Sequence, residues 1–151
     1  MKANYIRTIK KKIYNYVASN YKKIDNDKFI LGDMNYTYKC HYNAVQKIKE
    51  GKAVKVFACI AIDKNNSTEI AIHFVNQLED GTYQDNTWGW LYGSYDYYFI
   101  KEVDKSEQDD IWELLSSIRK SLVESNSNRF LYKLLRINKD IIWRVMPNAN
   151  T

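Results

Sequence analysis

Residues 69–88 read EIAIHFVNQLEDGTYQDNTW, and the two halves of this stretch predict a pair of strands. The first half, over residues 69–77, is rich in the β-branched and aromatic side chains that favour strands. Asp80 and Gly81 follow, and an Asp-Gly pair readily supplies the positive φ angles of a tight connection. The chain is therefore predicted to return as a second strand over residues 83–88, antiparallel to the first.

The flanking segments extend this hairpin into a larger sheet. Residues 54–62 and 95–103 have the same strand-forming composition, and residues 28–31 predict a further short strand. The expected sheet is antiparallel and has about four or more strands.

Apolar residues at helical spacing predict helices outside the sheet. An N-terminal amphipathic helix is expected over residues 5–24, and a second helix over residues 40–50, where Gly51 supplies a stop. Later in the chain, Ser106 is predicted to cap a third helix, with Asp109 completing a variant of the capping box. The apolar stripe of this third helix consists of Ile111, Leu114, Leu115, Ile118 and Leu122.

The remaining residues complete the expected architecture. Residues 129–137 predict a further C-terminal helix, and residues 141–146 predict a strand. Helices and strands are unevenly mixed rather than strictly alternating, which favours an α+β fold. No linker rich in Pro, Gly or Ser divides the 151 residues, so a single domain over residues 1–151 is expected.

Composition excludes several classes of protein. Hydrophobic residues make up 45% and charged residues 27% of the chain, which is typical of a globular domain and not of a disordered one. No apolar run is long enough to span a membrane, and no apolar region follows Met1. We therefore expect a cytoplasmic protein with reduced thiols and no membrane partner. The sequence does not indicate an oligomeric state.

Metal ions and cofactors are not expected. The chain has two cysteines, Cys40 and Cys59, and two histidines, His41 and His73, at spacings unlike those of any zinc finger or ribbon. Neither a Gly-rich phosphate loop nor a paired-cysteine motif is present.

Cys40 is the candidate nucleophile because it stands at the start of a predicted helix. The partial positive charge of a helix N-terminus lowers the pKa of a thiol, and the thiolate is the reactive form. A cysteine nucleophile also needs an imidazole base. On a helix, His41 would be rotated about 100° from Cys40, so His73 is the preferred base: on its strand it can point to one face while Ile72 and Phe74 pack on the other.

The residue that orients His73 depends on the length of the hairpin loop. If residues 79–81 form a three-residue loop with Gly81 in the left-handed region, Asp85 shares the face of His73. If the loop has only two residues, the register slips by one and Asn86 takes that place. The order Glu-Asp-Gly favours the longer loop, and therefore Asp85.

These segments resemble the transglutaminase-like and arylamine N-acetyltransferase-like enzymes of the papain-like superfamily. Cys40 precedes a helix, His73 begins the strand segment HFVN, and residues 80–89 read DGTYQDNTWG, which is similar to the hairpin pattern of those enzymes. The resemblance covers residues 35–103, the expected catalytic core. It implies a minimal, divergent papain-like fold in which Cys40 is the nucleophile, His73 the base and Asp85 the orienting residue.

The resemblance also implies the chemistry. A thiolate would attack a carbonyl to form an acyl-enzyme, which water or an amine then resolves. The chain would be a thiol hydrolase or acyltransferase (protease, amidase, deamidase or transglutaminase-like) whose substrate is a peptide or other amide, proteins included. The Cys40 backbone N–H and the Asn35 side chain would stabilise the oxyanion.

The remaining candidates have simpler roles. Trp88 and Trp90 are candidates for lining a substrate cleft, and Cys59 is expected in the core. The alternative to an enzyme is a small binding or inhibitor protein whose basic N-terminal helix and exposed tyrosines contact an acidic protein or nucleic acid. Of these two hypotheses the enzyme is preferred, and nucleic acid is not the favoured partner.

Overall fold

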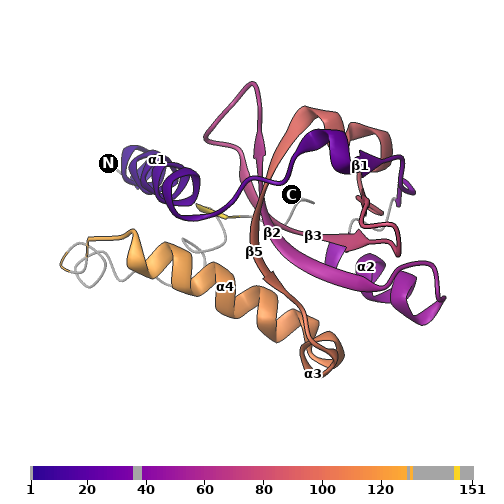
Figure 1. The fold of residues 1–151 in the computed structure, drawn as a ribbon. Coiled ribbons are helices and arrows are strands. Elements are labelled where there is room, and N and C mark those ends of the chain that lie inside the picture. The colour runs from indigo at the N-terminus through magenta and orange to yellow at the C-terminus, as the bar shows by residue number, and fades with distance from the viewer. Residues whose placement is uncertain (1, 36–38, 129, 131–144, 147–151) are drawn as a thin grey trace.

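Two long, buried strands, over residues 55–63 and 70–77, form the centre of the structure, and their side chains alternate between the two faces of the sheet. The computed structural model describes residues 2–35, 39–128, 130 and 145–146. These residues form a mixed α+β fold around a five-stranded sheet of order β1-β4-β3-β2-β5, antiparallel except that β1 and β4 are parallel (Figure 1). The strands are β1 (Phe29–Ile30), β2 (Lys55–Asp63), β3 (Ile70–Gln77), β4 (Tyr83–Gln84) and β5 (Tyr95–Glu102).

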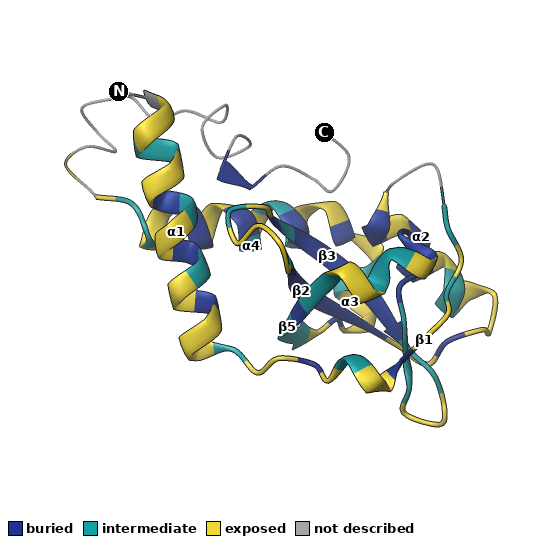
Figure 2. Cartoon of the chain, turned by 90° about the horizontal axis from the view of Figure 1, so that it is seen from above, coloured by how far each residue is buried: buried dark blue, intermediate teal, exposed yellow. Residues whose placement is uncertain are grey.

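Amphipathic helices cover one face of this sheet. Each long helix turns a stripe of buried side chains toward the protein and leaves its other face exposed, as Figure 2 shows for α1. The helices are α1 (Lys2–Asn20), α2 (Cys40–Lys49), α3 (Lys105–Asp109) and α4 (Ile111–Ser125), with two 3-10 helices, η1 (Asn26–Lys28) and η2 (Gly89–Ser94). None of the helices among the described residues is long and apolar enough to cross a membrane.

The two faces of the sheet have different chemistry. Residues of β2 with even numbers, such as Ala58 and Ile60, pack in one cluster with the buried residues of α1, α2 and α4. Residues with odd numbers, such as Phe57 and Cys59, pack in a second cluster that is rich in aromatic rings. We call these the helical face and the aromatic face. Cys59 is fully buried in the second cluster, which confirms it as a core residue.

The hairpin between β3 and β4 has the predicted three-residue loop. Leu78 N donates to Thr82 O at 2.9 Å, and Gly81 N donates to Leu78 O at 3.0 Å. Gly81 has a φ of 85°, in the left-handed region that glycine adopts without strain. The register that the longer loop sets, with Gln77 opposite Tyr83, is therefore confirmed.

Two predicted boundaries are wrong for identifiable reasons. The strand expected over residues 83–88 ends at Gln84, because the Asp85 carboxylate accepts the backbone N–H groups of Thr87 and Trp88 and turns the chain. The helix expected over residues 5–24 ends at Asn20, and Ile24 N instead donates to Tyr97 O of β5.

The predicted capping box is also misplaced. Asp104, not Ser106, is the N-cap of α3, and Glu107 completes the box. The predicted helix over residues 129–137 and most of the predicted strand over residues 141–146 lie outside the described residues. Val145 and Met146 are described, are buried and are not part of a strand.

Candidate active site

His73 lies in the middle of β3, directly opposite Cys59 of β2, and its side chain is fully buried. Its neighbours Ile72 and Phe74 pack on the helical face, whereas the His73 ring contacts Trp88 and Tyr97 of the aromatic face. His73 Nε2 is 2.8 Å from Asp85 Oδ2. The orienting pair that the three-residue loop predicts is thus in hydrogen-bond contact.

The carboxylate of Asp85 is fully buried and held by four groups. Its Oδ1 accepts the backbone N–H groups of Thr87 and Trp88, each at 2.9 Å. Its Oδ2 accepts the hydroxyl of Tyr97 at 2.6 Å, besides contacting His73. A buried carboxylate with this many donors remains ionised, because its charge is compensated on both oxygens.

Trp88 fixes the plane of the imidazole. Its ring stacks on His73 with a centroid separation of 3.9 Å and an interplanar angle of 12°. On its other side Trp88 stacks on Tyr95 at 4.1 Å. His73 is therefore held at one edge by Asp85 and across one face by Trp88.

Cys40 is the first residue of α2, as the sequence predicts. The N-cap residue, Lys39, makes no side-chain hydrogen bond to the helix end. The first N–H groups of α2 therefore keep their partial positive charge close to the sulfur. The Cys40 side chain is 3% exposed.

Electrostatics distinguish the two cysteines. Burial alone would raise the pKa of Cys40, but the positive charge of His73 and the neighbouring His41 outweigh it and lower this pKa to about 6. Cys59 is equally buried, and burial together with the charge of Asp85 raises its pKa. Cys40 is the thiol that ionises near neutral pH.

The pKa of the His73 imidazole is shifted upward, opposite to that of the Cys40 thiol. Burial would lower the pKa of His73, but the charges of Asp85 and Cys40 raise it to about 10. Burial would also raise the pKa of Asp85, but the charge of His73 and the hydrogen bonds hold it below its ordinary value. Between about pH 6 and pH 10, thiolate and imidazolium therefore coexist as an ion pair.

Nδ1 is the nitrogen through which His73 acts on Cys40, because Nε2 is bound to Asp85. Nδ1 makes no hydrogen bond of ordinary geometry within the described residues, so the interaction with the sulfur is mainly one of charge. Cys40 belongs to the helical-face cluster. On β3, only Asn76 and Gln77 pair with β4, so among the described strands the preceding part of β3 is paired on one side alone, by β2.

Side-chain amides join α2 to the loop that follows β4. Asn76 donates to the Ala44 carbonyl at 2.9 Å and accepts from Asn86 at 2.9 Å. Asn43 donates to the hydroxyl of Thr87 at 2.9 Å. Because Thr87 is two residues from Asp85, these bonds fix α2 relative to the Asp85 carboxylate. Asn86, the alternative orienting residue, binds Asn76 and not His73.

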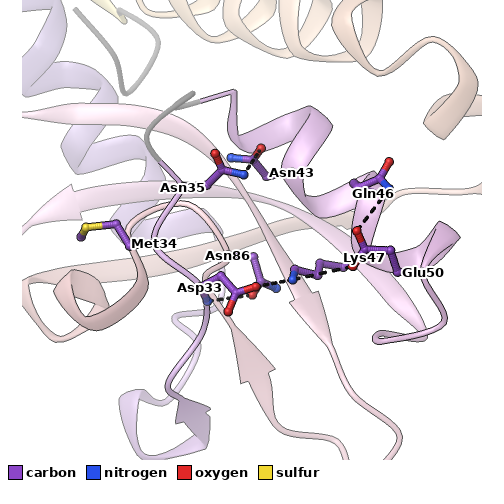
Figure 3. Close-up of a pocket in the computed structure, with 8 residues that line it drawn as sticks. All are labelled: Asp33, Met34, Asn35, Asn43, Gln46, Lys47, Glu50 and Asn86. Carbon is purple, nitrogen blue, oxygen red and sulfur yellow. Dashed lines mark hydrogen bonds and ion pairs between the residues drawn. The ribbon is translucent and has the colours of Figure 1, made fainter.

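Asn35 lies at the first turns of α2, where its side chain donates to Asn43 Oδ1 at 2.9 Å (Figure 3). The backbone N–H of Asn35 donates to Thr87 O. Asn35 and Asn43 line a polar cavity of about 320 Å³ beside α2. Lys47 lies in this cavity, paired with Asp33 and Glu50. The other lining residues are Met34, Gln46 and Asn86.

The two tryptophans have different surroundings. Trp88 is buried on His73, whereas Trp90, on η2, is 67% exposed. Trp88 therefore serves as packing for the imidazole, and Trp90 is the one whose ring is open to solvent.

Two further residues at the site were not predicted. Arg119 of α4 is 2% exposed, and burial lowers its pKa to about 10 while the charge of Cys40 raises it. His41 is buried with its ring 5.5 Å from that of Trp112 on α4. Trp112 and Arg119 are two turns apart on one helix, so a single face of α4 interacts with both His41 and Cys40. The stripe of the predicted α4 helix already included Leu115 and Leu122, whose spacing places Arg119 on the buried face.

The residues that the structure describes contain no cluster of three or more His, Cys, Asp or Glu side chains arranged to hold a metal ion. Comparisons with protein-family models, with curated proteins and with solved structures found no match to this chain.

Proposed function

We propose that this protein is a cysteine hydrolase or acyltransferase that acts on an amide or related acyl bond, with Cys40 as nucleophile, His73 as acid and base, and Asp85 as the orienting residue. One observation carries the proposal. A buried imidazole is bound at Nε2 to a buried carboxylate, and its positive charge lowers the pKa of a thiol at a helix N-terminus. We further propose that the α+β fold is a minimal, divergent papain-like one.

The reaction follows from the ion pair. The Cys40 thiolate forms a bond to the carbonyl carbon, and the carbonyl π electrons move to the oxygen. When the tetrahedral adduct collapses, the bond to the leaving nitrogen breaks and the His73 imidazolium gives that nitrogen its proton, which leaves a thioester. Water or an amine then loses a proton to His73 as it attacks the thioester, and breakage of the C–S bond restores the thiolate.

The oxyanion needs donors near the sulfur. The backbone N–H of Cys40 belongs to a helix N-terminus, and the Asn35 carboxamide is held beside the first turns of α2 by Asn43. Preorganised donors of this kind stabilise developing negative charge. The polar cavity lined by both asparagines follows α2 from Asn43 to Glu50, and its polar lining is suited to an amide substrate such as a peptide. The exposed ring of Trp90 offers a further contact for such a substrate.

Acyl-enzyme trapping tests the proposal directly. The full chain is treated with p-nitrophenyl acetate, and intact and peptide mass spectrometry locate the acetyl group. We expect one acetyl group, on Cys40, with a matching burst of nitrophenolate. The matched control is Cys59→Ala, which should behave as the wild type, whereas Cys40→Ala should show no burst.

Alkylation by iodoacetamide distinguishes the proposed thiol enzyme from the alternative of a non-enzymatic binding protein. We expect alkylation of Cys40 at neutral pH to be at least ~10-fold faster than alkylation of Cys59, because only Cys40 is thiolate there. Slow modification of both thiols at the same rate would contradict the catalytic role. It would favour the alternative of a basic binding module.

A further inference from the structure

A second cavity, of about 680 Å³, lies on the aromatic face of the sheet. Its volume is in the range of small-molecule sites, roughly 300–1,000 Å³. The cavity belongs to the cluster of Phe57 and Ile24, and not to the helical-face cluster that contains Cys40. Its lining residues are Lys22, Lys23, Ile24, Asp25, Lys28, Phe57, Tyr83 and Phe99.

The floor of this cavity consists of three aromatic rings from three strands. Phe57 is central, with its ring centroid 5.7 Å from that of Tyr83 and 5.2 Å from that of Phe99. Phe57 is buried, whereas Tyr83 and Phe99 are only partly buried. The partly buried rings present apolar surface on which a planar group can stack.

The rim is basic and is held by backbone hydrogen bonds. Phe99 N donates to Lys22 O at 2.8 Å, which ties this part of the rim to β5. Lys28 ends η1, and its N–H donates to Asp25 O at 3.0 Å. The side chains of Lys22 and Lys28 are both exposed. Their ammonium groups are therefore available on a fixed backbone.

The other two charges of the rim have contacts of their own. Lys23 forms an ion pair with Asp96 at 3.4 Å. The Asp25 carboxylate accepts the backbone N–H of Asp27 and caps η1. Lys22 and Lys28 thus supply the charge that a ligand would meet, and its sign favours an anion.

We propose that this cavity binds a nucleoside 5′-phosphate, either free or as one unit of a single-stranded nucleic acid. The base would stack on Tyr83 and Phe99, and the phosphate would lie against Lys22 and Lys28. Aromatic stacking combined with lysines is the general means by which proteins hold unpaired nucleotides. The site is separate from the Cys40–His73 pair and does not depend on the catalytic proposal.

Calorimetric titration of the full chain tests the site with four probes: AMP, adenosine, inorganic phosphate and a thymidine decanucleotide. We expect saturable AMP binding, with adenosine and phosphate each at least ~10-fold weaker, because each lacks one of the two contacts. A decanucleotide that binds more tightly than AMP would identify nucleic acid as the source of the ligand, and one that binds equally or more weakly would identify the free nucleotide.

Two variants with equal charge change locate the binding. Lys28→Glu should weaken AMP binding at least ~10-fold, whereas Lys12→Glu, an exposed lysine on α1, should change it less than about 2-fold. Tyr83→Leu should weaken AMP and leave phosphate binding unchanged. Thermal melts establish that each variant is folded.

Three outcomes would overturn the proposal: no saturable binding of AMP or decanucleotide, equal effects of the two Lys→Glu variants, or binding of phosphate as tight as that of AMP. Cys40→Ala should bind AMP as the wild type does, so the result is independent of whether the chain is a thiol enzyme.

Discussion

His73 Nε2 and the hydroxyl of Tyr97 meet at the same atom, Asp85 Oδ2, at 2.8 Å and 2.6 Å. The carboxylate therefore attracts the imidazolium proton and is itself kept ionised by a neutral donor from β5. This arrangement explains why the charge of Asp85 can raise the pKa of a buried histidine to about 10, although burial alone acts in the other direction.

The first prediction concerns pH. Because the pKa of Cys40 is lowered to about 6, thiolate absorbance in the ultraviolet should appear as the pH rises through 6, well below the ordinary 9.0. Acyl transfer should rise over the same range and fall near pH 10, where His73 loses the proton that the leaving group needs. In His73→Gln the thiolate midpoint should rise, since burial remains and the largest effect that lowers the pKa of Cys40 is lost, while His41 stays in place. An unchanged midpoint in this variant would show that His73 does not act on the thiol.

A second prediction separates the charge of Asp85 from its packing. Asp85→Asn should lower the rate of acyl transfer at least ~100-fold, because the amide neither holds the imidazolium nor fixes its tautomer. The matched variant is Tyr97→Phe, which removes one hydrogen bond to the same oxygen but leaves Asp85 bound to His73. It should lose only a few-fold in rate and about 1 kcal/mol of unfolding free energy. Equal losses in the two variants would count against an orienting role for Asp85.

A third prediction concerns the backbone behind the carboxylate. A Cβ added at Gly32 would lie 2.3 Å from the carbonyl oxygen of Asp85, which is main chain and has little room to move. Gly32→Ala should therefore cost about 1–3 kcal/mol of stability and reduce activity by displacing Asp85. Gly93→Ala is the control, since a Cβ there meets no atom within 4 Å. Thermal melts and acetylation rates of the two variants should differ, and matching values would refute the steric explanation.

A fourth prediction concerns Arg119. Its buried guanidinium interacts electrostatically with the Cys40 thiolate. Arg119→Met should therefore raise the pH at which the thiolate forms, and Arg119→Lys should reverse part of that rise. Ultraviolet titration measures this midpoint independently of stability. If Met and Lys give the same midpoint as Arg, the residue has only a packing role.

Local rules accounted for the strands, the start of α2 and the hairpin loop. The Glu-Asp-Gly loop could be predicted because only residue type and turn geometry determine it, and the loop sets the register that leads to Asp85. The end of β4 could not be predicted in the same way, since it depends on the Asp85 carboxylate accepting two backbone N–H groups. A periodic pattern carries no information about such a side-chain contact.

Arg119 and His41 were missed for a related reason. Arg119 lies near Cys40 only because α4 packs against α2, a contact between segments that are far apart in the sequence. His41 is next to Cys40 in the chain, but its ring contact with Trp112 depends on the same packing. A two-residue loop would place Asn86 where the three-residue loop places Asp85, and the actual partner of Asn86, Asn76, is also fixed by the three-dimensional packing.

Asp85 and Trp88, which hold the imidazole at its edge and its face, both follow the hairpin and contact His73 directly, without help from the Cys40 sulfur. Removing the sulfur in Cys40→Ala should therefore leave the rest of the reaction centre assembled. Such a variant would bind its natural target without converting it, and it is the form of the protein to use as bait for crystallisation with, or identification of, that target.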